Sequence, residues 1–250
     1  MASPPPPAAA SGDREPALAD RDLFIAVTSH ELRTPITVIK GFADTLIEHW
    51  DALDPAGRKA AVRVIGQRAN ELARLLDRLL AATTAPPGAP NLAPFDLLPA
   101  LRTAARELSA DLRARLRMTL PVALPKAYGD PGALTTILTE LVTNAAKYSQ
   151  REVEVTAGAD DRTVWFQVAD RGIGIAPEHV ERAFERYWQA DSGDRREYPG
   201  AGLGLFLVRR IVERQHGAVS LRPREGGGTV ATVGLLRADV AVVPPDPGEA

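Results

Sequence analysis

In the run Leu32-Arg-Thr-Pro-Ile-Thr-Val-Ile-Lys-Gly-Phe-Ala-Asp-Thr-Leu46, apolar residues recur at heptad spacing, which predicts a helix with one apolar seam that begins near Asp22. After a break around residues 50–55, the same rhythm runs from Val62 to Leu79 and predicts a second helix. A hairpin of these two helices cannot close a hydrophobic core alone. A second copy would complete a four-helix bundle, so we expect a homodimer. The alternative is a hairpin packed onto the rest of its own chain.

Composition narrows the class of protein. Of the 250 residues, 45% are hydrophobic and 25% are charged, as in soluble globular proteins, and there are no cysteines. Disulfides, zinc–thiolate sites and thiol catalysis are therefore excluded. The formal net charge of -2 gives no electrostatic case for nucleic acid as a partner. No apolar run is long enough to span a membrane, and the N-terminus lacks a signal-peptide pattern, so we expect a cytoplasmic protein.

Changes of pattern along the chain predict two folded domains and an α+β multidomain chain. The predicted divisions are a disordered Pro/Ala-rich leader at 1–20, the helical hairpin at 21–84, a linker at 85–94, a second domain at 95–238 and a loose tail at 239–250. In the second domain we expect helices near 97–108, 131–149 and 203–216, and strands near 113–118, 153–157, 164–168, 218–222 and 229–236. Antiparallel strands with helices on one side predict an α/β two-layer sandwich.

His30 has the chemistry of a phosphoryl acceptor. Helical geometry turns its side chain away from the apolar seam and toward solvent. The adjacent Glu31 can hydrogen-bond one ring nitrogen, which leaves the other as a nucleophile at neutral pH. Pro35 cannot donate to the carbonyl of Glu31, and this loosens the helix beside the nucleophile. Taken alone, the pattern also fits an ordinary surface histidine.

A second group of polar residues lies on one face of the helix predicted at 131–149. Glu140, Asn144 and Lys147 are spaced by one helical turn each, so their side chains share that face. The Asn144 amide oxygen is a hard ligand suited to Mg²⁺, and Lys147 offers a positive charge to phosphate. Glu140 can hold a metal-bound water. By itself, such a face also fits a solvated helix surface.

Two glycine-rich turns complete the set of candidate binding motifs. Asp170-Arg-Gly-Ile-Gly174 follows a strand, where a carboxylate can accept from the exocyclic amine of a base while the backbone approaches the ring. Gly200-Ala-Gly-Leu-Gly-Leu205 opens a helix and can present free amides to phosphate. The polar stretch 191–196 between the two turns is typical of a lid.

In this order, the motifs closely resemble the catalytic core of sensor histidine kinases of two-component systems. Ser29-His-Glu-Leu-Arg-Thr-Pro35 resembles the family's H box, and Asn144 with Lys147 and Tyr148 its N box. Residues 170–174 resemble the family's first glycine box, residues 184–187 its F box and residues 200–205 its second glycine box. The resemblance covers about residues 22–236. It implies a dimeric phosphotransfer hairpin followed by an ATP-binding domain of the kind shared with gyrase and the Hsp90 chaperone.

The resemblance also implies ATP and Mg²⁺ as cofactors. The binding residues that it implies are Asn144, Lys147, Tyr148, Asp170, Gly172, Gly174, Phe184, Gly202, Leu203 and Gly204, with Asn144 and Glu140 at the metal. Asp170 would contact adenine, and the amides of the second glycine box and the lid would close on the phosphates.

By the same resemblance, His30 would attack the γ-phosphorus of ATP with Glu31 as the orienting base, and then pass the phosphoryl group to an aspartate of a response regulator. Glu31 and Thr34 would position the water that dephosphorylates this regulator. Family members usually carry a sensor before the hairpin, so the signal would arrive through a longer form of the chain or from a separate sensor protein. The alternatives are an ATP-driven conformational ATPase of the gyrase/Hsp90 type and a non-catalytic dimer scaffold.

Overall fold

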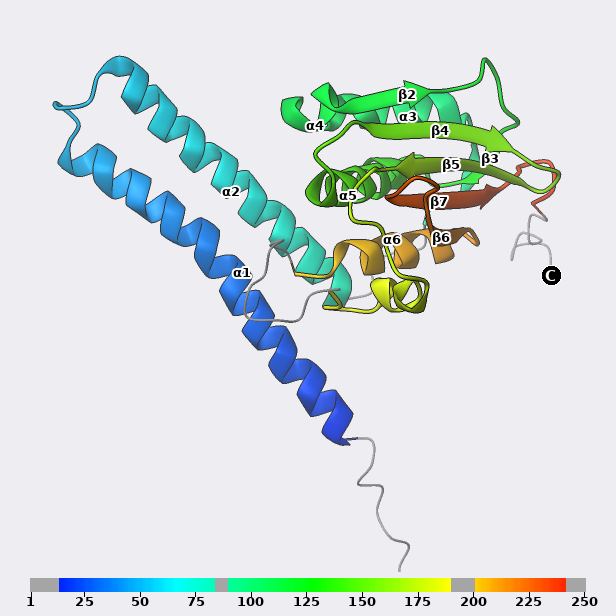
Figure 1. The fold of residues 1–250 in the computed structure, drawn as a ribbon, viewed down its shortest axis with the longest axis horizontal. Coiled ribbons are helices and arrows are strands. Elements are labelled where there is room, and N and C mark those ends of the chain that lie inside the picture. The colour runs from blue at the N-terminus through cyan, green and yellow to red at the C-terminus, as the bar shows by residue number, and fades with distance from the viewer. Residues whose placement is uncertain (1–13, 84–89, 190–200, 242–250) are drawn as a thin grey trace, which may run out of the picture. The chain divides into compact units, whose positions relative to one another are not determined.

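The computed structural model describes residues 14–83, 90–189 and 201–241, and the side chains of residues 14–30, Asp77 and 81–83 lie outside this description. The chain divides into two compact units, Met1–Leu79 and Leu80–Ala250 (Figure 1). Among the described residues, no helix has a segment apolar and long enough to cross a bilayer.

The first unit is the predicted helical hairpin. Helix α1 spans Arg14–Glu48 with Pro35 inside it, and α2 spans Pro55–Thr83, continuing past the boundary between the units. Asp54 caps α2, because its Oδ1 accepts the Gly57 amide proton at 2.7 Å. Arg58 fastens the turn by donating to the carbonyl oxygen of Trp50 at 2.8 Å, with its guanidinium 4.6 Å from the Trp50 ring centroid.

Helix α1 begins at Arg14, so the prediction of a disordered leader over 1–20 was wrong for residues 14–20. The prediction rested on the lack of anything to bury there. However, Arg, Glu, Ala and Leu, which make up most of residues 14–20, have good intrinsic helix propensity, and Pro16 lies in the first turn, where proline is tolerated. These residues therefore extend the helix without an apolar seam. Residues 1–13, which make up the rest of the predicted leader, lie outside the described residues.

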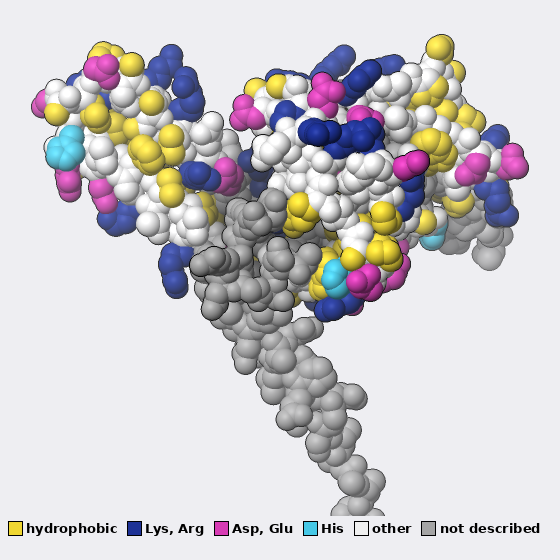
Figure 2. Space-filling model, viewed as in Figure 1, with side chains coloured by type: hydrophobic (Ala, Val, Ile, Leu, Met, Phe, Trp, Pro, Cys, Tyr) yellow, Lys and Arg dark blue, Asp and Glu magenta, His cyan; other side chains and the backbone are white. Residues whose placement is uncertain are grey.

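The hairpin buries a narrower apolar stripe than the heptad pattern predicts. On α2, Ala61, Leu75 and Leu79 are buried, whereas Val62 and Leu76 of the predicted seam are 56% and 51% exposed. On α1, Ile36 of the predicted seam is 49% exposed. Figure 2 shows hydrophobic side chains gathered on the surface of the hairpin near its turn. A large part of the seam is therefore uncovered within one copy of the chain.

The second unit is a two-layer α/β domain (Figure 1). Its main sheet has five strands in the order β2-β4-β5-β7-β6. These strands are β2 Leu116–Thr119, β4 Val153–Ala159, β5 Thr163–Ala169, β6 Ala218–Pro223 and β7 Thr229–Leu236. The helices are α3 Leu97–Glu107, α4 Ala110–Ala114, α5 Ala133–Tyr148 and α6 Gly204–Glu213. The expected sandwich is confirmed, except that β2 and β4 pair in parallel, so the sheet is mixed rather than antiparallel throughout.

Strict alternation along the strands gives the sheet one buried face. In β5, for example, Val164, Phe166 and Val168 are buried and the residues between them are half-buried. The buried face packs against residues of the helices that are also almost fully buried: Leu101, Leu138, Val142, Val208 and Val212. This packing fixes α5 and α6, which carry the polar motifs, against the sheet.

Three local predictions in this unit differ from the structure. Residues 113–118 form the end of α4 and then β2, because Ser109 caps a helical turn by accepting from Leu112 N at 3.5 Å. Two short strands, β1 Ala93–Phe95 and β3 Ala127–Gly129, pair with each other and were not predicted. Three residues are too few for a periodic pattern. The first of these strands also begins inside the predicted linker, and most of the predicted tail lies outside the described residues.

Candidate nucleotide and phosphotransfer sites

The predicted phosphoacceptor motif lies within α1. His30, Glu31 and Thr34 all fall inside Arg14–Glu48, and Pro35 interrupts the helical hydrogen bonding beside them. The helix spacing places positions 31 and 34 on one face. The side chain of His30 lies outside the described residues, so its predicted orientation toward solvent stays a prediction.

Helix α5 carries the Glu-Asn-Lys face in the other unit. Glu140 is buried, Asn144 and Lys147 are half-buried, and the Lys147 ammonium lies 4.7 Å from the Tyr148 ring centroid. Arg115 holds the carboxyl end of the helix: it donates to the carbonyl oxygens of Ala146 at 3.2 Å, of Ser149, and of Arg151 at 2.9 Å. The last turn of the helix, which carries Lys147 and Tyr148, is thus fixed by a residue between α4 and β2.

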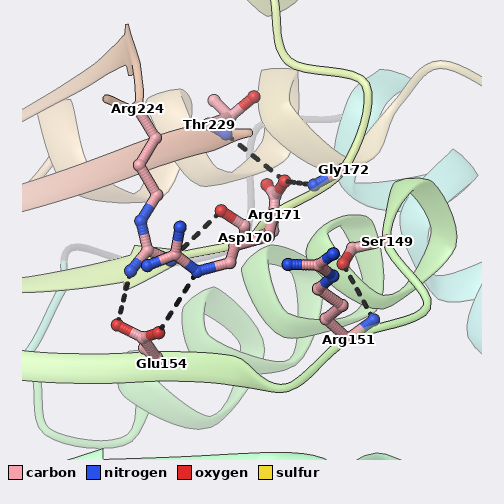
Figure 3. Close-up of polar contacts among 8 residues, drawn as sticks. All are labelled: Ser149, Arg151, Glu154, Asp170, Arg171, Gly172, Arg224 and Thr229. Atoms are coloured by element: carbon pink, nitrogen blue, oxygen red, sulfur yellow. Dashed lines mark hydrogen bonds and ion pairs between the residues drawn. The ribbon is translucent and has the colours of Figure 1, made fainter. Parts of the chain in front are cut away.

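Asp170 lies directly after β5 and is buried (Figure 3). Its Oδ1 accepts from Gly172 N at 2.8 Å and from Thr229 N at 3.3 Å. Within the described residues, the second carboxylate oxygen accepts no further hydrogen bond. Burial raises the pKa of the Asp170 carboxyl, while these two amides and the Arg224 guanidinium act in the opposite direction. One oxygen therefore anchors the side chain and the other is available to a ligand.

The first glycine turn packs directly on α5. A Cβ atom on Gly172 would overlap the Tyr148 carbonyl oxygen and lie 2.7 Å from the Tyr148 carbonyl carbon. Gly174 has a φ of 78°, and a Cβ there would lie 3.3 Å from the Gly228 carbonyl oxygen. Glycine at both positions lets the turn pass between the end of α5 and the β6–β7 loop.

The second glycine turn meets the same helix at its middle. A Cβ on Gly204 would lie 2.7 Å from Glu140 Oε2, which places that carboxylate at the amino end of α6, where negative charge is favourable. Gly202 has a φ of 67°, and its carbonyl oxygen accepts from Tyr187 N at 2.9 Å. Leu203 between them is buried. The predicted lid at 191–196 lies outside the described residues.

Phe184 anchors the F-box segment on α6. It ends the 3-10 helix η2 Arg182–Phe184, is buried, and has the Arg209 guanidinium 5.1 Å from its ring centroid. Arg209 is oriented by Glu181 at 3.1 Å and Glu213 at 3.0 Å. Sequence reasoning did not identify Arg209, Thr229 or Arg224. The run of glycines immediately before Thr229 is the signal that could have drawn attention to the β6–β7 loop.

Taken together, α5 is the common wall of the second unit's site. The Asp170 turn meets its carboxyl end and the second glycine turn meets Glu140, so most of the predicted binding residues converge on one helix. A helical hairpin with a histidine motif, followed by a two-layer domain in which two glycine turns meet one helix, is the arrangement of a two-domain histidine kinase core.

The comparisons agree with this class. Residues 20–88 match the family described as the His Kinase A (phospho-acceptor) domain. Residues 129–239 match the histidine kinase-, DNA gyrase B- and HSP90-like ATPase family. The chain belongs to the sensor histidine kinases of two-component systems.

Among curated relatives, the sensor histidine kinase YkoH of Bacillus subtilis is 30% identical over 211 residues, covering 84% of this chain and 46% of that protein. The phosphate regulon sensor protein PhoR of Pseudomonas aeruginosa is 31% identical over 224 residues, covering 87% of this chain and 50% of that protein. The chain thus spans about half the length of the curated relatives it matches.

Solved structures share the fold. Full-length ShkA in complex with AMPPNP aligns with a TM-score of 0.60 and 30% identity, covering 89% of this chain and 47% of that one. Histidine kinase ThkA in complex with the response regulator protein TrrA aligns with a TM-score of 0.64 and 22% identity, covering 90% of this chain and 64% of that one.

Proposed function

We propose that this chain transfers the γ-phosphoryl group of ATP to His30, and from there to an aspartate of a response regulator. The observation that carries the proposal is the buried Asp170 carboxylate, anchored through one oxygen beside a glycine turn that packs on α5. An acceptor so placed suits the exocyclic amine of adenine. The AMPPNP bound by the similar protein ShkA supports the same ligand here.

The remaining predicted residues receive roles consistent with their positions. Lys147 would neutralise phosphate charge, the amides of Gly202 and Gly204 would bind phosphate at the start of α6, and Tyr148, Gly172, Gly174, Phe184 and Leu203 would shape the adenine and phosphate surfaces. His30 would attack in line with Glu31 as its orienting base, and positioning would supply most of the catalysis.

The donor set fits Mg²⁺. The buried Glu140 carboxylate and the Asn144 amide lie one turn apart on α5, and both offer the hard oxygen donors that this ion prefers. Asn144 would hold the ion and Glu140 would hold one of its waters. When bound, Mg²⁺ neutralises phosphate charge during transfer.

We further propose that a second copy of the chain covers the hairpin, and that the dimer works in the cytoplasm, where ATP and a response regulator are available. The half-exposed apolar residues Ile36, Val62 and Leu76 support the dimer, because a second hairpin would bury them. The input would come from a sensor region of a longer chain or from a separate sensor protein.

The test is incubation of the purified chain with γ-labelled ATP. Wild type should acquire an acid-labile, base-stable label, as expected for a P–N bond, while His30→Gln should bind ATP and acquire none. Asn144→Asp should keep the fold and lose most labelling, because it adds a negative charge beside the phosphates. Label that survives in His30→Gln would refute the assignment. Steady hydrolysis of ATP without labelled protein would instead favour the conformational ATPase.

Phosphatase activity is a separate part of the proposal. Thr34 should be dispensable when His30 attacks ATP, yet needed to position water against an aspartyl phosphate. Thr34→Ala is therefore expected to autophosphorylate normally and to slow the decay of purified phosphorylated regulator. Equal decay with wild type and variant would exclude a role for Thr34 in dephosphorylation.

A further inference from the structure

The β6–β7 loop, residues 224–228, lies against the backbone of Asp170. A Cβ on Gly228 would overlap the Asp170 carbonyl oxygen and lie 2.8 Å from the Arg171 Cα. The Asp170 amide donates to the Thr229 carbonyl oxygen at 2.9 Å, and the Thr229 amide returns a bond to the Asp170 side chain. The position of the carboxylate therefore depends on the position of this loop.

Arg224 ties the loop to the end of β5 and to β4 (Figure 3). Its Nη1 donates to the Asp170 carbonyl oxygen at 3.2 Å, and its Nη2 donates to Glu154 Oε2 at 2.7 Å. The Arg224 side chain is 14% exposed and that of Glu154 36% exposed, so this ion pair is shielded more than a surface pair. Glu154 holds the guanidinium in the orientation that reaches Asp170.

Arg224 also spans its own loop. Its amide donates to the Gly228 carbonyl oxygen at 2.9 Å, and its carbonyl oxygen accepts from Gly227 N at 3.0 Å. The glycines of the loop have positive φ angles of 76°, 98° and 102°, which leaves their conformation to be fixed by such contacts. The same residue thus closes the loop and fastens it to the Asp170 backbone.

We propose that Arg224, oriented by Glu154, is a positioning residue that holds Asp170 in the place that selects adenine over guanine. This inference rests on the proposed binding of ATP at Asp170. An ionised carboxylate accepts from the exocyclic amine of adenine, whereas guanine presents an oxygen at the corresponding position and would be repelled.

Electrostatics give the role a measurable signature. Among the described residues, Arg224 from the β6–β7 loop is the charged group that acts on the Asp170 carboxyl. Glu154 from β4 pairs with Arg224 and with Arg171 of the Asp170 turn, and Lys147 lies in the last turn of α5, on which that turn packs. Burial raises the pKa of the Asp170 carboxyl and Arg224 lowers it. Removing Arg224 raises this pKa further, so the carboxyl takes up a proton at a higher pH. A protonated carboxyl loses an acceptor for adenine and gains a donor for the guanine oxygen.

The experiment is titration of the purified chain with Mg-AMPPNP and with Mg-GMPPNP between pH 6 and 8. Arg224→Met should weaken AMPPNP binding by about tenfold, since a hydrogen bond to a charged group is lost near the ligand. In this variant, the pH below which AMPPNP binding weakens should also be higher than in wild type. The preference for AMPPNP over GMPPNP should fall, and it should fall most at pH 6. Glu154→Gln should give the same changes to a smaller extent. Arg224→Lys should restore part of the affinity, because lysine keeps the charge without the planar fork.

Arg222→Met is the matched control. Arg222 lies on β6 and is exposed, so this variant loses the same charge two residues away and should bind both nucleotides like wild type. Wild-type affinity, pH profile and base preference in folded Arg224→Met would overturn the proposal. If that variant does not fold, unchanged binding by Glu154→Gln overturns it equally. Failure of the proposed function is distinct: wild type would not bind AMPPNP, or Asp170→Asn would bind it normally.

Discussion

Replacement of Gly172 by alanine tests whether the close packing of the Asp170 turn on α5 sets nucleotide affinity. The added Cβ would overlap the Tyr148 carbonyl oxygen and lie 2.7 Å from its carbonyl carbon. Both atoms belong to the backbone, so no side chain can rotate away to relieve the contact.

The size of the effect follows from the shift that relieves the overlap. Carbon atoms in contact normally lie about 3.5–4.0 Å apart, so the turn and the end of α5 must separate by about 1 Å. The bond from Gly172 N to Asp170 Oδ1 is 2.8 Å long, and a shift of that size breaks it. A hydrogen bond to a charged group contributes about 1.5–3 kcal/mol, which corresponds to a roughly ten- to hundredfold weaker Kd for ATP.

The assay is calorimetric titration of wild type and Gly172→Ala with Mg-AMPPNP, with thermal unfolding followed by circular dichroism to establish that the variant is folded. Gly234→Ala is the matched control, because the nearest atom to a Cβ there is the Ala218 carbonyl oxygen at 4.0 Å. It should bind like wild type. Binding by Gly172→Ala within twofold of wild type would refute the reasoning that this contact positions Asp170.

Two further changes test other parts of the structure. Arg115→Met should lower the unfolding temperature of the second unit by several degrees and its free energy of unfolding by about 2–3 kcal/mol, because three carbonyl groups at and just after the end of α5 lose a charged donor. Arg117→Met, an exposed change two residues further on in β2, should have little effect in the same melting experiment. Leu76→Glu should shift the chain toward monomer in analytical ultracentrifugation, since it puts a charge on the uncovered face of α2, whereas Val122→Glu, at a fully exposed position, should leave the association state unchanged. A Leu76→Glu variant that sediments like wild type would contradict the proposed four-helix dimer.

Much of the architecture could be predicted because its signals are local. Heptad spacing predicted both hairpin helices, and strict alternation predicted β4, β5 and β7 close to their observed bounds. The start of α1 and the short strands β1 and β3 were missed. The start of α1 has helix propensity but no apolar seam, and β1 and β3 are only three residues long. Neither feature gives a periodic pattern in the sequence.

Candidate site residues were predictable where a motif concentrates them in a short run. Asn144 and Lys147 share a helix face, and Asp170 precedes a glycine turn, so sequence spacing together with the family resemblance pointed to them. Spacing could not say that the Gly204 backbone lies beside Glu140 or that the Gly172 backbone lies against Tyr148. Those contacts depend on how α5 and α6 pack on the sheet.

The sequence by itself determined the order of the domains, the family and the motifs, because each is encoded by residues that are neighbours along the chain. Only the tertiary structure decided how Asp170 is held. Arg224 is 54 positions from Asp170 and 70 from Glu154. The three meet because β4 pairs antiparallel with β5, and β5 with β7. These registers bring the start of β4, the end of β5 and the start of β7 to the same end of the sheet. The β6–β7 loop carries Arg224 to that end as well. Register is set by the burial of whole strand faces in the core, so no local run of sequence specifies that meeting point.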